Sequence, residues 1–241
     1  MPPSEVVLVE DGALTESLEE VVKKYEQKYV ELKVIRYERN RGLGKALHDG
    51  LLLCTSDLVA RMDSDDICRK DRFEKQIKVF VEHPEIDVCG AWIDEFETAP
   101  TDTVSTRILP ETHEELFEFA KLRNPVNHPV VMFRKQAVLD SGNYQEFPLF
   151  EDYYLWVRMM MHGYRFYCIQ ESLLDFRKAN GMIARRGGWN YAMTEMRLQK
   201  TFHNMGYISL SRMIKNMAIR FTARVIPSSL RNTVYDLIRK N

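Results

Sequence analysis

The segment Leu58–Asp66 reads LVARMDSDD, a short apolar run that ends in three carboxylates around one serine. A short apolar run is typical of a strand that is buried on both faces of a parallel sheet. In open parallel sheets, ligands bind beyond the carboxyl ends of the strands. The acidic cluster therefore lies where a ligand site is expected.

Two chemical interpretations of this acidic cluster are open. Asp63 and Asp65 can face one hard divalent cation, Mn²⁺ or Mg²⁺, which takes few protein oxygens and completes its shell with substrate phosphates. Asp and Ser also favour a solvated turn that caps the next helix. Phosphatases with an aspartyl nucleophile carry D-x-D at a strand end too, but Asp66-Ile67 fits their pattern poorly.

Strand and helix signals alternate on both sides of this segment. We expect further strands at Val6–Val9, Leu32–Tyr37, Asp87–Phe96 and Pro129–Phe133, and helices at Leu14–Tyr29, Lys45–Leu53, Asp71–Glu82, Glu111–Leu122 and Glu151–His162. This alternation predicts an α/β fold with a mainly parallel sheet and helices on both faces. From about Gly188 onward the chain is mostly helical and basic.

Composition narrows the class of protein. The 241 residues are 45% hydrophobic and 29% charged, which is enough for a full core and excludes a disordered or fibrous chain. The four cysteines form no C-x-x-C pair, so neither a zinc ribbon nor a dense disulfide framework is expected. Because there is no signal peptide and no apolar run long enough to span a bilayer, we expect a cytoplasmic protein.

The charge is distributed unevenly. Residues 197–241 contain nine basic residues and one acid, whereas the whole chain has a net charge of −1. The basic residues there alternate with apolar ones, a pattern that suits a helix lying on anionic lipid. A helix packed on the main domain with a solvated basic face explains the same pattern. We expect a peripheral contact with an anionic membrane and no nucleic-acid partner.

Two further segments place polar residues at the ends of expected elements. Phe150–Trp156 opens a helix with Glu151 and Asp152; such acids are commonly structural, but among aromatic residues a partly buried carboxylate can act as a general base. Asp11–Gly12 ends the first strand, and Asn40–Lys45 (NRGLGK) is a glycine loop that can approach a phosphate or a polar base. Ordinary turn chemistry explains either of these last two segments by itself.

In combination, four of these segments resemble the family 2 glycosyltransferases of the GT-A fold. The segments are Val9–Gly12, Asn40–Gly42, Met62–Asp66 and Glu151–Trp156, in the family's order over roughly residues 5–177. Asn127–Pro129 (NHP) and Arg185–Gly188 (RRGG) further resemble the branch that acts in bacterial capsule, exopolysaccharide and lipopolysaccharide assembly. The resemblance implies a three-layer GT-A catalytic domain over residues 1–187 and a basic helical extension over residues 188–241.

The resemblance also implies roles in binding a nucleotide-sugar donor. Asp11 would hydrogen-bond the nucleotide base, and Arg41 would close the same pocket. Asp63 would lie near the ribose and beside the metal, and Asp65 would ligate the Mn²⁺ or Mg²⁺ that bridges the two phosphates. Arg185 and Arg186 would add positive charge near the leaving nucleoside diphosphate, although solvated surface arginines are the alternative.

For the chemical step, the resemblance implies that Asp152 deprotonates the acceptor hydroxyl and that Glu151 orients it. Direct attack at the anomeric carbon would then invert its configuration. His128 is expected to be a structural, hydrogen-bonded histidine.

One departure from the family pattern concerns the first strand. Family members normally begin with an additional strand and helix, and Met1–Ser4 resembles the loop after that helix. The additional strand would lie between Val6–Val9 and Leu58–Met62. We therefore expect an N-terminally truncated domain.

These observations predict an inverting, metal-dependent enzyme that moves one sugar from a nucleotide-diphospho-sugar, a UDP-sugar first, to a lipid-linked polysaccharide acceptor. Single-sugar transfer is expected because the Q-x-x-R-W signature of processive synthases is absent. The alternative is a truncated, non-catalytic protein that binds a nucleotide or a membrane. A sugar nucleotidyltransferase is disfavoured, because no glycine- and arginine-rich phosphate loop follows the first strand.

Overall fold

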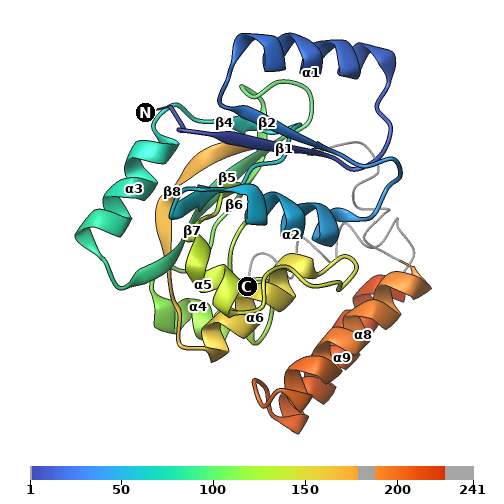
Figure 1. Ribbon diagram of the computed structural model, residues 1–241. Coiled ribbons are helices and arrows are strands. Elements are labelled where there is room, and N and C mark those ends of the chain that lie inside the picture. Colours follow the sequence, from blue (N-terminus) through green and yellow to red (C-terminus); the bar gives the residue numbers. More distant parts are fainter. Residues whose placement is uncertain (1, 179–187, 226–241) are drawn as a thin grey trace.

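The computed structural model describes residues 2–178 and 188–225, which fold into two sheets with helices around them (Figure 1). The smaller sheet pairs β1 (Val6–Glu10) with β2 (Leu32–Arg36) in parallel. α1 (Glu16–Lys28) connects these strands, and α2 (Leu43–Leu53) packs against β1. This βαβ unit agrees with the expected alternation.

The larger sheet has six strands and is mixed. Its order is β3 (Leu58–Ala60), β7 (Met132–Arg134), β5 (Ile86–Phe96), β8 (Arg165–Arg177) and β4 (Ile67–Cys68), with β6 (Thr103–Arg107) paired to β5. Among its described pairs, β5 and β8 run parallel and the others run antiparallel. The expectation of a mainly parallel sheet is therefore wrong for this sheet, because an apolar run does not encode the direction of its partner.

β6 and β8 were not expected from the sequence. β8 reads RFYCIQESLLDFR. Its polar middle breaks both the alternation typical of a half-buried strand and the continuous apolar run typical of a fully buried one. Its apolar residues are nevertheless buried, since Phe166, Cys168, Leu173 and Leu174 are all 0% exposed. Register shifts between Ala91 and Trp92 of β5 accompany this irregular stretch.

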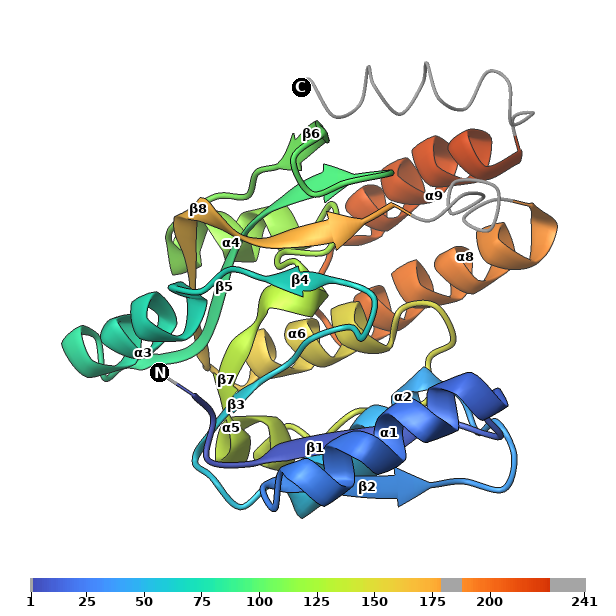
Figure 2. The same ribbon diagram turned by 90° about the horizontal axis from the view of Figure 1, so that it is seen from above.

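Five further helices belong to the main domain. They are α3 (Arg72–Glu82), α4 (His113–Ala120), α5 (Lys135–Asp140), α6 (Glu151–Met161) and the 3₁₀ helix η1 (His128–Val130). Of these, α3, α4, α5 and α6 are seen beside the larger sheet in Figures 1 and 2. α4 begins with a capping box, in which Thr112 and Glu115 satisfy each other's backbone N–H. α6 lies in the core, where its Trp156 is 0% exposed and meets Phe133 and Phe166.

β1 and β3 belong to different sheets, and no hydrogen-bonded ladder joins them in the described residues. The additional strand expected between them remains a prediction. Glu5, just before β1, bridges to the segment before β3: its Oε1 accepts the N–H of Thr55 at 2.5 Å and that of Ser56 at 3.1 Å. Side-chain contacts therefore link the two sheets at this point.

Beyond the undescribed residues 179–187, α8 (Trp189–Asn204) and α9 (Leu210–Val225) lie side by side as a helical hairpin (Figures 1 and 2). The Glu195 carboxylate in α8 is 0% exposed and pairs with Arg220 and Arg224 of α9, the latter at 2.7 Å. Asn216 of α9 donates to the Lys121 carbonyl at 2.8 Å, which ties the hairpin to the main domain. No helix in the described ranges is both long and apolar enough to cross a membrane.

We expect Glu195→Gln to lower the free energy of unfolding by about 2 kcal/mol. The change leaves two arginines without their counter-charge, and breaking a fully buried pair costs about 3 to 5 kcal/mol. The cost is smaller here because the Arg220 side chain is 17% exposed. Urea denaturation checks the value, with the exposed Lys200→Gln as a control within about 0.5 kcal/mol of the parent. Equal stability of the two variants would show that the ion pairs do not fix the hairpin.

Candidate active site

At the end of β3, Asp63 is held by the arginine two residues before it. Arg61 is 9% exposed, and both of its terminal nitrogens contact the Asp63 carboxylate, Nη1 at 2.8 Å from Oδ2. The Arg61 carbonyl in turn accepts a 2.7 Å hydrogen bond from Arg72, a fully buried residue of α3. Charged side chains are thus fixed at the strand end, as the sequence predicts for a ligand site.

Asp66 and the last residue of β8 hold the acidic cluster in place. It is 7% exposed, and its Oδ1 accepts the N–H of Arg177, the last residue of β8, at 2.9 Å. The Arg177 Nε donates to the carbonyl oxygen of Asp65 at 3.0 Å. Burial raises the pKa of Asp66 to about 6, and the negative charges of Asp63 and Asp65 add to this rise. The end of β8 therefore fixes the backbone of the cluster.

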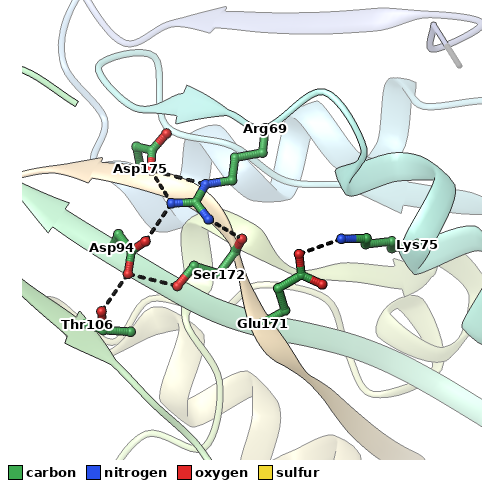
Figure 3. A network of polar contacts seen from close by, with 7 residues as sticks. All are labelled: Arg69, Lys75, Asp94, Thr106, Glu171, Ser172 and Asp175. Carbon is green, nitrogen blue, oxygen red and sulfur yellow. Dashed lines mark hydrogen bonds and ion pairs between the residues drawn. The ribbon is translucent and has the colours of Figure 1, made fainter. Parts of the chain in front are cut away.

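A second arginine fixes the chain just after the cluster (Figure 3). Arg69 follows β4 and reaches across the sheet to Asp175 at 2.7 Å, Asp94 at 2.5 Å and the Ser172 carbonyl at 2.7 Å. Asp94 also accepts the hydroxyl of Thr106 at 2.6 Å. One guanidinium thus links the segment after β4 to β5 and β8, and through Asp94 to β6, so that both ends of the acidic cluster are anchored.

Asp152 lies in the first turn of α6 and faces the same end of β3. Its Oδ1 accepts the N–H of Tyr153 at 2.7 Å, and its Oδ2 accepts the side-chain amide of Asn124 at 2.5 Å. Burial raises the pKa of this carboxyl, while both hydrogen bonds and the positive charge of Arg61 lower it. A carboxylate with a raised pKa that is held by an amide is suited to accept a proton.

His128 of η1 lies next to Asp152, with its Nδ1 4.0 Å from the Asp152 Oδ2. Its Nε2 contacts the hydroxyl of Tyr144 at 3.0 Å, and its ring meets Trp156 edge-on. Burial and the charge of Arg61 hold the pKa of His128 well below its usual value of 6.5. The histidine is therefore neutral near pH 7, and its hydrogen bond and ring contacts agree with the structural role expected for it.

The glycine loop is bound by the acid that ends the first strand. The Asp11 carboxylate accepts the backbone N–H of Arg41 at 2.6 Å and that of Gly42 at 3.0 Å. Gly42 has φ +89°, a conformation that favours glycine. The Arg41 guanidinium lies 4.8 Å above the Tyr37 ring, where it offers a planar charged surface.

Gly44, at the start of α2, brings this loop against α6. A Cβ atom at this position would lie 2.9 Å from the Cγ of Glu151, closer than Cβ contacts occur. Burial raises the pKa of Glu151. A small depression of about 210 Å³ opens here, lined by Gly44, Lys45, His48, Tyr144 and Glu146. The glycine loop and the first residue of α6, Glu151, are therefore direct neighbours.

We expect Gly44→Ala to lower kcat about tenfold without unfolding the protein. The new methyl group must displace Glu151, and a small misplacement at a catalytic centre is costly, up to about 10²-fold for 1 Å. Gly50→Ala is the matched control, because the same change on the same helix meets a methyl group of Val9 at 3.1 Å. Initial rates with both variants test this prediction. Equal rates would show that the contact between Gly44 and Glu151 does not affect the chemical step.

The acidic cluster fits a divalent cation that is held mainly by its substrate. Asp65 is exposed, and its carboxylate has no hydrogen-bond or ion-pair partner among the described residues, whereas both Asp63 oxygens contact Arg61. The buried Asp66 Oδ2 is also without a hydrogen bond there. No three acidic, histidine or cysteine side chains in residues 2–178 and 188–225 form a ligand set. Mg²⁺ prefers to be coordinated by one or two protein carboxylates together with oxygens of substrate phosphates.

The structure brings most of the predicted site residues together. Arg61 contacts Asp63 and its charge lowers the pKa of Asp152, and the glycine loop that Asp11 binds meets Glu151 at Gly44. Arg185 and Arg186 lie outside the described residues. Sequence reasoning missed three candidate site residues, Arg61, Asn124 and Arg177, because nothing in their local pattern shows that they contact an acid. Arg61 contacts an acid two residues away, whereas Asn124 and Arg177 each contact an acid in a distant part of the chain.

Comparisons with known proteins identify relatives of this chain and of its fold. A family model described as "Glycosyl transferase family 2" matches residues 1–141. An uncharacterized glycosyltransferase of Haemophilus influenzae is 42% identical over 96% of this chain and 86% of its own length. The amylovoran biosynthesis glycosyltransferase AmsE of Erwinia amylovora is 37% identical over 98% and 88%.

A third relative is the UDP-Gal:alpha-D-GlcNAc-diphosphoundecaprenol beta-1,3-galactosyltransferase of Escherichia coli, 36% identical over 98% of this chain and 85% of its own. Among solved structures, S. aureus TarS in complex with UDP-GlcNAc superposes with a TM-score of 0.63 at 19% identity, covering 91% of this chain and 63% of that chain. The mannosyltransferase PcManGT of Pyrobaculum calidifontis, in complex with GDP-Man and Mn²⁺, gives 0.60 at 16% identity over 98% and 71%. Both share this fold.

Proposed function

The chain belongs to glycosyltransferase family 2, and we propose that it transfers one sugar from a UDP-sugar to a hydroxyl of a lipid-linked acceptor in bacterial polysaccharide assembly. Relatives that are 36 and 37% identical over nearly the whole chain act in amylovoran biosynthesis and on a diphosphoundecaprenol-linked sugar, by their names. These relatives support the substrate class.

One observation carries the proposal most directly. Arg61 contacts the carboxylate of Asp63, and its charge acts on the carboxyl of Asp152. A donor diphosphate near the acidic cluster and an acceptor hydroxyl near Asp152 would therefore both lie within the field of one arginine. Proximity of the two reactants is the first requirement of a direct transfer.

For the donor, we assign the nucleotide to the region between the glycine loop and the acidic cluster. Asp11 holds the loop and accepts a hydrogen bond from the base, and Arg41 on Tyr37 closes the pocket. Asp63 lies near the ribose. Asp65 is the first ligand of Mn²⁺ or Mg²⁺ and Asp63 the second; when bound, the cation neutralises charge that develops on the leaving nucleoside diphosphate. Arg185 and Arg186 are assigned to the same leaving group.

For the chemical step, we assign the general base to Asp152. Its carboxylate accepts the proton of the acceptor hydroxyl, whose oxygen forms a bond to the anomeric carbon as the bond to the diphosphate breaks. Attack from the face opposite the leaving group inverts the anomeric configuration. The Asn124 amide orients Asp152, and Glu151 positions the acceptor beside the glycine loop.

The lipid part of the acceptor defines where the reaction takes place. We assign the protein to the cytoplasm, in peripheral contact with the inner face of the plasma membrane. All four cysteines are free thiols, which fits a reducing compartment.

The direct test is to supply UDP-sugars with Mn²⁺ and a short-chain analogue of a diphosphate-linked GlcNAc acceptor. We expect UDP release that depends on the acceptor, together with an inverted glycosidic product identified by NMR. The alternative function, a non-catalytic protein that binds a nucleotide or a membrane, predicts binding without turnover. Saturable UDP binding with no product from any donor would overturn the proposal.

A further inference from the structure

The α8–α9 hairpin presents a surface whose charge is of one sign. Glu195 is the one acid in residues 188–225, and it is buried between Arg220 and Arg224. Those two arginines share one carboxylate inside the hairpin, where a net positive charge remains. Four other basic residues are at the surface: Arg197, Lys200, Arg212 and Lys215. The described outer surface of the hairpin is therefore basic with no acidic side chain.

Large apolar side chains lie among these basic residues. On α8, Trp189 is 63% exposed and Met193 is 47% exposed. On α9, Leu210, Ile214 and Ile219 are 54, 57 and 50% exposed. Exposing this many large apolar side chains to water is unfavourable in free energy. An exposed apolar surface with basic residues among it indicates contact with another molecule or with a membrane.

The order of residues along α8 is that of an interfacial helix. Trp189, Met193, Arg197 and Lys200 follow one another at intervals of four, four and three residues, so they share one face of the helix. The opposite face, with Leu198 and Phe202, is fully buried. Tryptophan prefers the boundary between headgroups and acyl chains, and long basic side chains extend to phosphates.

We propose that the hairpin surface, defined as Trp189, Met193 and Lys200 of α8 with Leu210, Ile214, Lys215 and Ile219 of α9, docks on an anionic phospholipid bilayer. Arg197 is left out of this surface because its guanidinium lies over the Phe147 ring of the main domain, 5.5 Å from its centroid. Apolar side chains enter the boundary region and the basic ones pair with lipid phosphates. A nucleic acid would use the charges and leave the aliphatic residues in water. The inference rests on the proposed function only in that a lipid-linked acceptor requires the enzyme at a membrane.

Co-sedimentation with vesicles tests the proposal on the whole chain. We expect binding to vesicles that contain phosphatidylglycerol and only weak binding to pure phosphatidylcholine vesicles. Salt should weaken the binding to the phosphatidylglycerol vesicles. Fluorescence gives a second measurement, since Trp156 is fully buried and Trp189 is the most exposed tryptophan. The emission of Trp189 should shift to shorter wavelength with anionic vesicles, and the Trp189→Phe variant should lose this shift.

The decisive variant is Lys200→Glu with Lys215→Glu, because neither side chain has a hydrogen-bond or ion-pair partner among the described residues and both are exposed. We expect its partition to anionic vesicles to fall at least about tenfold. The matched control, Lys24→Glu with Lys78→Glu on α1 and α3, has the same change in net charge on exposed positions and should bind like the parent.

Equal loss in both double variants, or equal binding to neutral and anionic vesicles, would overturn the proposal. Sedimentation of the parent without vesicles would indicate contact between copies of the chain and would overturn it too. Transfer to a short-chain soluble acceptor, measured in parallel, separates the two ideas: vesicle binding without transfer contradicts the proposed function alone, and transfer without vesicle binding contradicts the docking surface alone.

Discussion

Replacing Asp152 by Asn is expected to lower kcat by about 10² to 10⁴, the usual cost of losing a general base. UDP affinity should barely change, because the nucleotide is assigned to the glycine loop and the acidic cluster and not to Asp152. In the parent, the acid limb of the pH–rate profile should lie above the ordinary Asp pKa of 3.8, since burial raises the pKa of Asp152. Rates from pH 4 to 8 with a fixed UDP-sugar provide the measurement.

This substitution also disturbs a hydrogen bond, and a second variant separates the two effects. Both carboxylate oxygens of Asp152 accept, so an amide there places a donor against either the Tyr153 N–H or the Asn124 amide. Adding Asn124→Asp reverses the second hydrogen bond and should restore stability without restoring the rate. If the double variant regains activity, or if UDP affinity falls as far as turnover, Asp152 is a structural residue.

Asp65→Ala is expected to lower kcat/KM by about 10² to 10³, equivalent to about 3 to 4 kcal/mol of transition-state stabilisation lost with one ligand of a phosphate-bridging cation. The fold should be unaffected, because the Asp65 carboxylate is exposed and has no polar partner in the described residues. Thermal shift with UDP, with and without Mn²⁺, should show that the variant loses the Mn²⁺-dependent part. Ser64→Ala, at an exposed position in the same turn, is the control. Unchanged Mn²⁺-dependent turnover would contradict the metal assignment.

The order of elements could be predicted because apolar runs and helical periods are local properties. β1, β2, α3 and β5 begin or end within a residue or two of the expected positions. Strand direction could not be predicted, since β7 fits between β3 and β5 only in the folded chain. β8 was missed because its polar residues, Gln170 and Glu171, lie at a bulge that only pairing with β5 explains.

For the candidate site, the sequence could single out residues with a chemical signal of their own, but not those that contact these residues only in the folded chain. Asp63, Asp65 and Asp152 end or begin elements, where acids are visible in sequence. Arg61 is a single basic residue that follows an apolar strand. Its carbonyl accepts a hydrogen bond from Arg72 of α3, a contact that the local sequence does not show. Charge counting likewise included Arg220 and Arg224 in the basic tail, although both pair with the buried Glu195, which offsets one of their two charges.

The contact between Gly44 and Glu151 has a consequence for recombination between relatives. Because the Cγ of Glu151 occupies the place of a side chain at position 44, the nucleotide loop and the first turn of α6 are sterically matched, although more than 100 residues separate them. A chimera that exchanges the loop alone would join surfaces that were shaped against different partners. We therefore expect a chimera that exchanges one of these two segments to lose stability, and a chimera that exchanges both segments together to keep it.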